Sequence, residues 1–155
     1  MSEVPEFPVL VTESGNGPYA QFITAGHHIL AADEPEYLGG HDTGPSPYNF
    51  LLAGLGACTA MTMRGYASRH GWRIEHITVA LRHEKMPQPN GADAIDRFER
   101  LIALKGQLTG EQRMSLLGVA ENCPVSRTLK RPSVIVSRLT EDEPSAAATA
   151  TSPGS

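Results

Sequence analysis

The chain has 155 residues, a hydrophobic fraction of 40% and a net charge of −4 at pH 7. These values predict one globular domain and exclude both a disordered chain and a strongly basic nucleic-acid binder. No apolar run reaches the roughly 18 residues of a membrane span, and the N-terminal residues lack a signal-peptide pattern, so we expect a cytoplasmic protein. Two cysteines are too few for a disulfide scaffold but enough for one redox pair.

Charge is unevenly distributed along the sequence. Residues 1–63 contain seven acidic residues and no Lys or Arg, whereas residues 64–140 contain all thirteen basic residues. Two halves of this kind either face each other, within one chain or across a dimer, or form two separate solvated faces. We take the pattern as mild support for a homo-oligomer.

Short strands are expected in the first thirty residues. Residues 9–13 are rich in β-branched side chains, residues 19–24 alternate, and residues 28–31 form a third short apolar run. The following segment, residues 32–46, is rich in Asp, Glu, Gly and Pro and predicts a loop. A loop of about 15 residues is long for a compact domain and often has a functional or interface role.

A helix is predicted next, in the segment GPSPYNFLLAGLGACTAMTMRGYASRHG. Ser46 is a favourable N-cap, Pro47 a favourable first helical residue, and Gly71 a plausible C-cap. Residues 50–63 carry no charge. We therefore expect this helix to be apolar on every side and to lie at the centre of the fold.

The remaining chain predicts two paired strands, a helix and a last strand. Residues 76–85 and 96–105 alternate around a turn, so we expect an antiparallel pair. Thr109 predicts the N-cap of a helix that runs to about Asn122, and a helical turn follows Pro124. Residues 134–139 (VIVSRL) predict a final strand. The fold class is α+β over residues 1–140, with a low-complexity, disordered tail over residues 141–155.

Cys58 lies inside the predicted apolar helix, about three turns from its start. One interpretation is a small buried hydrophobic residue, because free cysteine is often buried. The other is a reactive thiol, since a break at Gly54 and Gly56 would place Cys58 near a new helix N-terminus that stabilises a thiolate. Small neighbours such as Ala57 would also let another segment or a substrate approach closely.

Cys123 precedes Pro124 and is expected to begin the short helical turn. That position, with Arg127 and Lys130 following, favours a thiolate. The alternative is a half-buried structural cysteine at a helix end. The sequence leaves open whether the two cysteines touch. The six histidines show no metal-ligand spacing, so no metal site is predicted.

Two motifs, GPSPYNFLLAGLGACTAMTMRGYA and ENCPVSRTL, resemble the OsmC / organic hydroperoxide resistance (Ohr) superfamily, in its OsmC-like branch. The resemblance extends over about residues 19–139. It implies an OsmC-like α+β fold in which an antiparallel sheet surrounds a buried central helix. It also implies that two chains intertwine into a homodimer with sites at the interface.

The resemblance further implies a thiol-dependent peroxidase, a cysteine-based hydroperoxide reductase that acts in oxidative-stress defence without a cofactor. Cys58 matches the peroxidatic residue, which becomes a sulfenic acid when it reduces an organic hydroperoxide. Cys123 matches the resolving residue, which then forms a disulfide. A dithiol such as a lipoylated protein would reduce that disulfide, and no nucleic-acid or membrane partner is expected.

This sequence departs from the family at the groups that bind the peroxide. Family members have a glutamate ten residues before the first cysteine and an arginine in the N-terminal strands. Here Tyr48 and Asn49 lie at the glutamate position, and residues 1–63 contain no arginine. We expect a hydrogen bond from Tyr48 and a positive charge from an arginine elsewhere, the candidates being Arg64, Arg69 and Arg127.

Two other functions agree with the same sequence. The apolar run at residues 50–55 fits a non-catalytic OsmC-fold protein that binds an apolar small molecule at the dimer interface. A cysteine redox sensor that signals through a Cys58–Cys123 disulfide is the second alternative.

Overall fold

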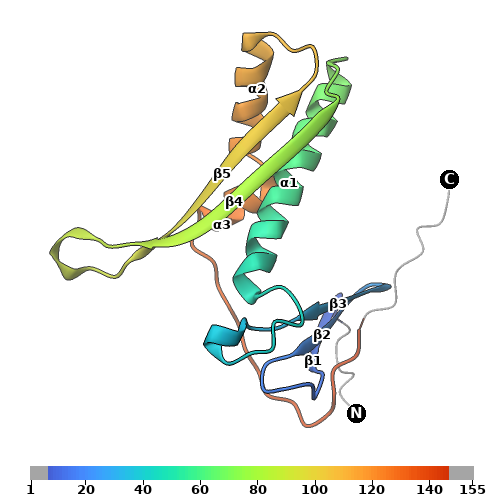
Figure 1. The fold of residues 1–155 in the computed structure, drawn as a ribbon, viewed down its shortest axis with the longest axis vertical. Helices are drawn as coiled ribbons and strands as arrows, with labels where there is room; N and C mark the ends of the chain where they lie inside the picture. Colours follow the sequence, from blue (N-terminus) through green and yellow to red (C-terminus); the bar gives the residue numbers. More distant parts are fainter. Residues whose placement is uncertain (1–6, 147–155) are drawn as a thin grey trace. The chain divides into compact units, whose positions relative to one another are not determined.

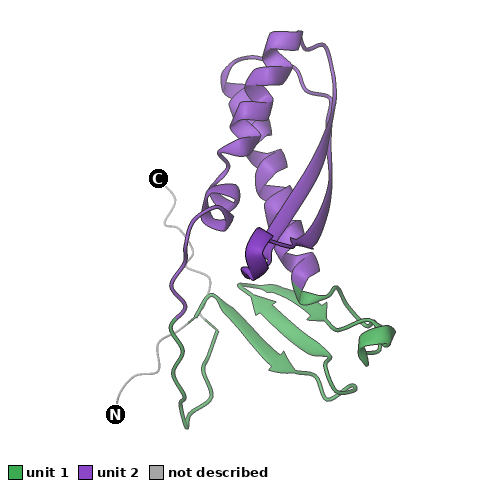
Figure 2. Ribbon diagram, turned by 90° about the vertical axis from the view of Figure 1, so that its left-hand side faces the viewer, with its two compact units in different colours: residues 1–47, 136–155 green, residues 48–135 purple. Residues whose placement is uncertain are grey.

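The computed structural model describes residues 7–146. The chain divides into two compact units, one formed by residues 1–47 with 136–155 and the other by residues 48–135 (Figure 2). The tail predicted to be disordered lies mostly outside the described residues. Its first part, residues 141–146, contains no helix or strand apart from an isolated bridge between Phe7 and Ala146.

The first unit contains an antiparallel sheet of three strands in the order β1-β2-β3. The strands are β1 (Val9–Glu13), β2 (Gln21–Ala25) and β3 (His28–Ala32), which confirms the three predicted strands. Gly26, with φ of 60°, makes the tight turn between β2 and β3, a conformation that favours glycine.

The long loop after β3 is organised around Asp33. This buried carboxylate accepts hydrogen bonds from the backbone N–H groups of Glu34, His41 and Thr43 and from the Thr43 hydroxyl, at 2.8–3.1 Å. A short 3-10 helix, η1 (Glu36–Leu38), lies within the loop. Hydrogen bonds to the Asp33 carboxylate therefore hold this loop in place within the first unit.

In the second unit, α1 (Pro47–Arg69) is one uninterrupted helix of 23 residues. Its start and its end before Gly71 confirm the prediction. The break at Gly54 and Gly56, on which the interpretation of Cys58 at a new helix N-terminus depended, is absent, because the helix continues through both. Gly56 instead permits a close approach, since a Cβ there would lie 2.7 Å from the Leu81 side chain.

The helix α1 was expected to lie at the centre of the fold, but within this single chain it is buried along one side only. Its buried residues form one stripe, spaced mainly at four residues: Leu55, Gly56, Thr59, Met63 and Ala67. Met61 is 73% exposed, and Leu51 is also exposed. The physical reason is that one strand pair and two further helices cover only one side of α1.

β4 (His76–Met86) and β5 (Ile95–Lys105) form a long antiparallel hairpin. It confirms the predicted strand pair, and its turn contains the short helix η2 (Pro89–Gly91) and projects beyond the helices (Figure 1). This hairpin and the β1-β2-β3 sheet are separate. The expected single sheet around the central helix is therefore corrected to two sheets, one in each unit.

The core of the second unit lies between the hairpin and the helices. α2 (Gly110–Glu121) begins with the predicted Thr109 N-cap, which forms a capping box with Gln112, and α3 (Pro124–Leu129) follows. Figure 2 shows α1 and α2 on the same side of the hairpin. The buried core consists of Met63, Ala67, Ile74, Leu116 and Ala120.

The predicted last strand is absent. Residues 134–139 form no strand, and Val134 and Ile135 are 91% and 89% exposed. An alternating apolar run forms a strand only where a sheet edge is present to pair with it, and this chain leaves the run unpaired.

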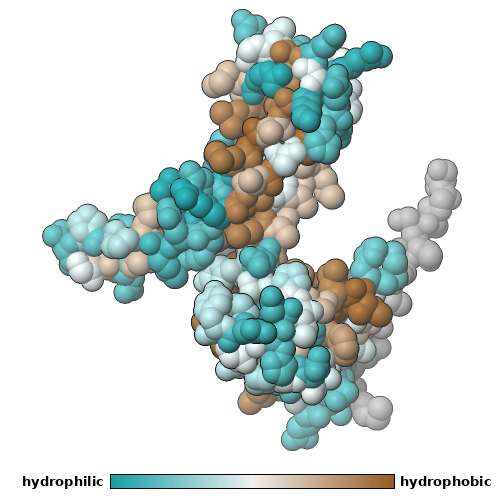
Figure 3. Space-filling view, in the orientation of Figure 1, coloured by the Kyte–Doolittle hydropathy of each residue, from teal (hydrophilic) through white to brown (hydrophobic). Residues whose placement is uncertain are grey.

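Figure 3 shows that hydrophobic residues also gather on the surface of the second unit, over the hairpin and helices. None of the described helices is long and apolar enough to span a membrane.

Candidate functional site

The two cysteines belong to a region where α1, β5 and α3 meet. Cys58 is half-buried on α1, and Cys123, the N-cap of α3, is fully buried. Thr59, the neighbour of Cys58, has its Oγ1 3.9 Å from the Cys123 Sγ. The Cys58 Sγ lies 4.0 Å from the Thr62 Oγ1. Both cysteines are free thiols, and folding brings together two sequence regions that are 64 positions apart.

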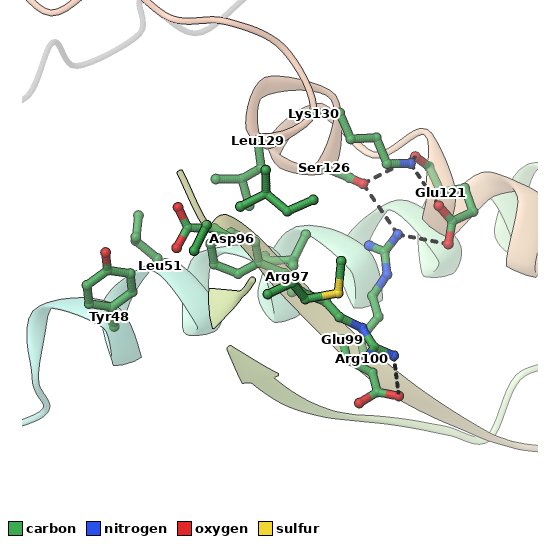
Figure 4. Close-up of a pocket in the computed structure, with 15 residues that line it drawn as sticks. Tyr48, Leu51, Asp96, Arg97, Glu99, Arg100, Glu121, Ser126, Leu129 and Lys130 are labelled. Carbon is green, nitrogen blue, oxygen red and sulfur yellow. Dashed lines mark hydrogen bonds and ion pairs between the residues drawn. The ribbon is translucent and has the colours of Figure 1, made fainter. Parts of the chain in front are cut away.

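Arg100 of β5 points into this region and is the positive charge beside Cys123. Its Nη1 donates to the Thr59 Oγ1 at 2.8 Å and lies 3.8 Å from the Cys123 Sγ. Its Nη2 donates to the Ser126 Oγ at 3.4 Å and pairs with the Glu121 Oε1 at 3.4 Å (Figure 4). The side chain is only 10% exposed, so these partners compensate most of the cost of burying its charge.

The alternation of β5 explains why Arg100 points inward. Residues at spacing two along a strand share one face, and Arg100 lies in register opposite Leu81 of β4. The core-facing residues of β5 are Phe98, Arg100, Ile102 and Leu104. A single charge in an otherwise apolar stripe is the sequence signal that identifies Arg100 as a candidate, and our sequence analysis did not use it.

The surroundings of Cys123 favour its thiolate. Burial by itself would raise the pKa of this thiol. Hydrogen bonding from the Ser126 backbone, and then from the side chains of Cys58, Thr59 and Arg100, outweighs burial and holds the pKa below its ordinary value. The thiolate is the nucleophilic form of cysteine, so the lowered pKa favours the nucleophilic form of Cys123.

Glu121 connects the elements that hold Arg100. Its Oε2 accepts a hydrogen bond from the Lys130 Nζ at 2.8 Å, while its Oε1 faces Arg100. The Lys130 hydrogen bond is the main cause of a lowered Glu121 pKa, with attraction from Lys130 and Arg100 acting in the same direction against burial. Glu121 is therefore ionised near neutral pH and ties α2 to both β5 and α3.

A cavity of about 1140 Å³ opens beside this cluster in the second unit. Arg100 and Ser126 are among its lining residues, which also include an apolar wall. That wall is made by Tyr48, Leu51, Leu55, Phe98 and Leu129. The cavity can therefore bring an apolar molecule to the guanidinium that faces Cys123.

Tyr48 lies at the other end of the cavity from Glu121 (Figure 4). Its ring stacks on His83, with centroids 4.5 Å apart, and the His83 Nε2 lies 2.7 Å from the Asp96 Oδ1. Because α1 is continuous, Tyr48 is about 15 Å along the helix axis from Cys58. The structure thus places Tyr48 away from the cysteines, and Asn49 is exposed beside it.

The arginines singled out from the sequence lie elsewhere. Arg127 is exposed on α3, Arg69 is exposed in the last turn of α1, and Arg64 donates to the Ile74 carbonyl. Within residues 7–146 of this chain, none of the three side chains hydrogen-bonds to a cysteine sulfur. The same residues contain no group of three or more His, Cys, Asp or Glu side chains that could hold a metal ion.

The chain also matches the model of a known protein family. The model of the family described as OsmC-like protein matches residues 40–138, which include both cysteines, Arg100 and Glu121. The chain belongs to the OsmC-like family. No curated protein sequence matches the chain.

Solved structures of OsmC-like family members share the fold. An OsmC-like protein from Mycoplasma pneumoniae is 16% identical, with coverage of 84% of this chain and 89% of that chain and a TM-score of 0.66. An organic hydroperoxide resistance protein from Legionella pneumophila is 20% identical, with coverage of 83% and 92% and a TM-score of 0.60. The organic hydroperoxide resistance protein OhrB of Bacillus subtilis is 22% identical, with coverage of 77% and 87% and a TM-score of 0.55. At these identities the likeness shows the fold alone.

Proposed function

We propose that this OsmC-like protein is a thiol-dependent peroxidase that reduces organic hydroperoxides through Cys58 and Cys123. The observation that carries the proposal is the meeting of the Cys58 region of α1 with a buried Cys123 that faces Arg100 at 3.8 Å. The sulfur of Cys58 attacks the peroxide, the O–O bond breaks, and the departing alkoxide takes a proton to become an alcohol. Cys58 is left as a sulfenic acid.

Cys123 completes the cycle. Its sulfur attacks the sulfur of the sulfenic acid, so that an S–S bond forms and the hydroxyl group leaves as water with one proton. An external dithiol, such as the lipoyl group of a lipoylated protein, then reduces the disulfide by thiol exchange. A cycle of this kind suits a reducing compartment and favours the cytoplasm and a role in oxidative-stress defence.

The apolar wall of the cavity supports an organic substrate over hydrogen peroxide. Leu51, Leu55 and Leu129 offer contact to a hydrocarbon group, while Arg100 offers a charge to the peroxide oxygens. The names of the Legionella and Bacillus proteins, which refer to organic hydroperoxide resistance, agree with this substrate class.

We also propose a homodimer. The exposed side of α1, with Leu51 and Met61, and the unpaired apolar run at residues 134–136 leave large hydrophobic side chains uncovered, and such exposure often marks a protein–protein interface. A second copy of the chain that covers both would remove this exposure, as the family resemblance leads us to expect.

The proposed function is tested by mixing the pre-reduced protein with a few equivalents of cumene hydroperoxide or hydrogen peroxide. Thiol loss and intact mass are followed with time, and the urea-unfolded protein gives the rate of an unassisted thiol. We expect fast loss with the organic peroxide and a mass decrease of two hydrogens as the disulfide forms.

The two cysteine variants separate the roles. Cys58→Ser is expected to abolish peroxide consumption, whereas Cys123→Ser still permits one turnover and accumulates a sulfenic acid on Cys58. Equal rates for Cys58→Ser and the wild-type protein would contradict the proposal. Thiol loss no faster than in urea would favour the non-catalytic binding protein, and oxidation without repeated turnover would favour the redox sensor.

A further inference from the structure

We propose that Arg100 is a catalytic residue of the second step of this cycle, in which its guanidinium stabilises the thiolate of Cys123 as that sulfur attacks Cys58. The inference deepens the proposed function and rests on it. Arg100 touches a reacting sulfur, since its Nη1 donates to the Cys123 Sγ at 3.8 Å. One arginine thus promotes the formation of the disulfide, separately from its contact with a peroxide in the cavity.

The guanidinium of Arg100 is held in one orientation. Its two terminal nitrogens carry four hydrogens, and four groups surround them. Nη1 donates to the Thr59 Oγ1 at 2.8 Å as well as to the Cys123 Sγ. Nη2 donates to the Ser126 Oγ and faces the Glu121 Oε1, each at 3.4 Å. Because the side chain is only 10% exposed, little water competes for these contacts, and the charge stays directed at Cys123.

The contacts of Arg100 distinguish between the two cysteines. Within residues 7–146, its hydrogen bonds and its ion pair include one with the Cys123 sulfur and none with Cys58. The Cys58 Sγ instead lies 4.0 Å from the Thr62 Oγ1, on its own helix. The charge of Arg100 is therefore directed at the sulfur that attacks in the second step, and that step depends on it most.

Burial makes a nearby cation necessary for Cys123 to react. Cys123 is completely buried, and burial disfavours the charged thiolate. Attack on another sulfur proceeds through the thiolate, so a buried thiol without a cation beside it is mostly protonated and slow at neutral pH. The Arg100 guanidinium offsets that cost at the place where the negative charge forms.

The other charged and titratable groups around Cys123 are compatible with this role. α1 contributes Cys58, the attacked sulfur, and α2 contributes Glu121, which pairs with Arg100. α3 contributes Lys130, whose Nζ pairs with the Glu121 Oε2 at 2.8 Å. When the disulfide forms and the thiolate disappears, Glu121 still provides Arg100 with a counterion. The oxidised site therefore does not contain an unpaired buried charge.

The step balances without any further reactant. The Cys123 thiolate attacks the sulfur of the Cys58 sulfenic acid, an S–S bond forms, and the S–O bond breaks. The departing hydroxide takes from solvent the proton that Cys123 had released there, and it leaves as water. Cys123 is oxidised and the sulfenic sulfur is reduced, each to the level of a disulfide.

The test follows the attack of Cys123 on Cys58 without peroxide. Reduced protein is mixed with excess dithiobis(nitrobenzoate), an aromatic disulfide that releases a coloured thiolate at each exchange. Cys58, the more exposed thiol, forms a mixed disulfide in the first phase of release. Cys123 then displaces the second coloured thiolate, in a phase whose rate does not depend on reagent concentration. Cys123→Ser should show the first phase only, which assigns the two phases.

Arg100→Gln is expected to slow the second phase at pH 7. Loss of the opposite charge raises a thiol pKa by about 1–3 pH units, and the higher nucleophilicity of the more basic thiolate offsets about half of this effect, so we expect a rate lower by about 3- to 30-fold. The deficit should shrink as pH rises and disappear once Cys123 is ionised in both proteins. The first phase should change less. Arg100→Lys keeps the charge and should slow the second phase less than Arg100→Gln.

Arg82→Gln is the matched control, since Arg82 pairs with Glu99 on the same hairpin but is exposed and is not among the residues that line the cavity. Equal second-phase rates for the Arg100→Gln and Arg82→Gln variants, or a deficit that is the same at every pH, would overturn the inference. Circular dichroism checks the fold. If Arg100→Gln does not fold, the pH profile of the wild-type second phase is the test. Its midpoint should lie below the ordinary cysteine value of about 8.5, and a midpoint at or above that value would overturn the inference.

Cumene hydroperoxide separates this inference from the proposed function. In Arg100→Gln we expect the Cys58 sulfenic acid to persist, so that a second peroxide molecule oxidises it to the sulfinic acid and itself becomes an alcohol, which intact mass detects. Disulfide formation from peroxide, with an unchanged second phase in Arg100→Gln, would overturn the inference and leave the proposed function standing. Absence of peroxide consumption in the wild-type protein, with a slowed second phase in Arg100→Gln, would refute the proposed function and leave the effect of Arg100 on disulfide formation standing.

Discussion

The Thr59 Oγ1 lies 3.9 Å from the Cys123 Sγ, and the same oxygen accepts a hydrogen bond from Arg100 at 2.8 Å. Thr59 is completely buried and also donates to the Leu55 carbonyl. One hydroxyl thus joins α1, β5 and the start of α3. A threonine in the middle of an apolar helix is explained by this contact, because its oxygen satisfies a buried guanidinium.

Thr59→Val tests that relationship. Valine has nearly the same shape but no acceptor, so one Arg100 N–H is left unpaired, and we expect a loss of about 1–3 kcal/mol in the free energy of unfolding. Urea unfolding of the reduced protein measures it. Thr59→Ser keeps the hydroxyl and is the control. If Thr59→Val were as stable as Thr59→Ser, the hydroxyl would not be the group that holds Arg100.

Asp33→Asn tests the loop after β3. Burial would raise the pKa of Asp33, but hydrogen bonds from the Thr43 hydroxyl and from the backbone of Thr43, Glu34 and His41 lower it below the ordinary value of 3.8. A lowered folded-state pKa means that the carboxylate stabilises the fold above pH 3.8, and that this contribution disappears as pH falls through the folded-state pKa.

The expected result is therefore a pH-dependent difference in melting temperature. Asp33→Asn should melt below the wild-type protein at neutral pH, and the gap should close only in acid, below about pH 4. Thermal melts across this range measure the gap, with Asp42→Asn as a control, since Asp42 is exposed in the same loop. A gap that stays constant into acid would show that the charge of Asp33 has no stabilising role.

Local patterns predicted most elements of the second unit. Ser46, Pro47 and Gly71 marked the limits of α1, and the spacing-two alternation marked β4 and β5. These signals act over a few residues and do not depend on distant parts of the chain. The positions of the two cysteines were predicted from the family resemblance, whereas their shared contacts depend on how α1 and α3 pack.

The errors arose where the outcome depends on packing. The apolar run at residues 50–63 suggested burial on all sides, but burial requires partners for every side, and one chain supplies them for one stripe only. Arg100 was overlooked because arginines were sought near the cysteines in sequence. A strand brings together groups that are far apart in the chain, and a charged residue on its apolar face was the available signal.

Leu116→Ala tests the core of the second unit. Leu116 is completely buried on α2 against the helix α1 and the hairpin, so its truncation should lower the free energy of unfolding by about 2–5 kcal/mol. Leu117→Ala is the matched control on the next position of the same helix. Leu117 is exposed, and its truncation should cost about 1 kcal/mol or less. Equal losses in the two variants would contradict the assigned core.

Ile135→Lys tests the proposed homodimer. Ile135 is 89% exposed in the single chain, so a lysine there should leave the folded chain intact, while burial of its charge in an interface would be costly. We expect the wild-type protein to sediment as a dimer, and Ile135→Lys to shift toward monomer as concentration falls. Thr140→Lys, which adds the same charge just beyond the apolar run, should remain dimeric. A wild-type monomer at high concentration would refute the dimer, and a dimer unaffected by Ile135→Lys would show that another surface, such as the exposed side of α1, forms the interface.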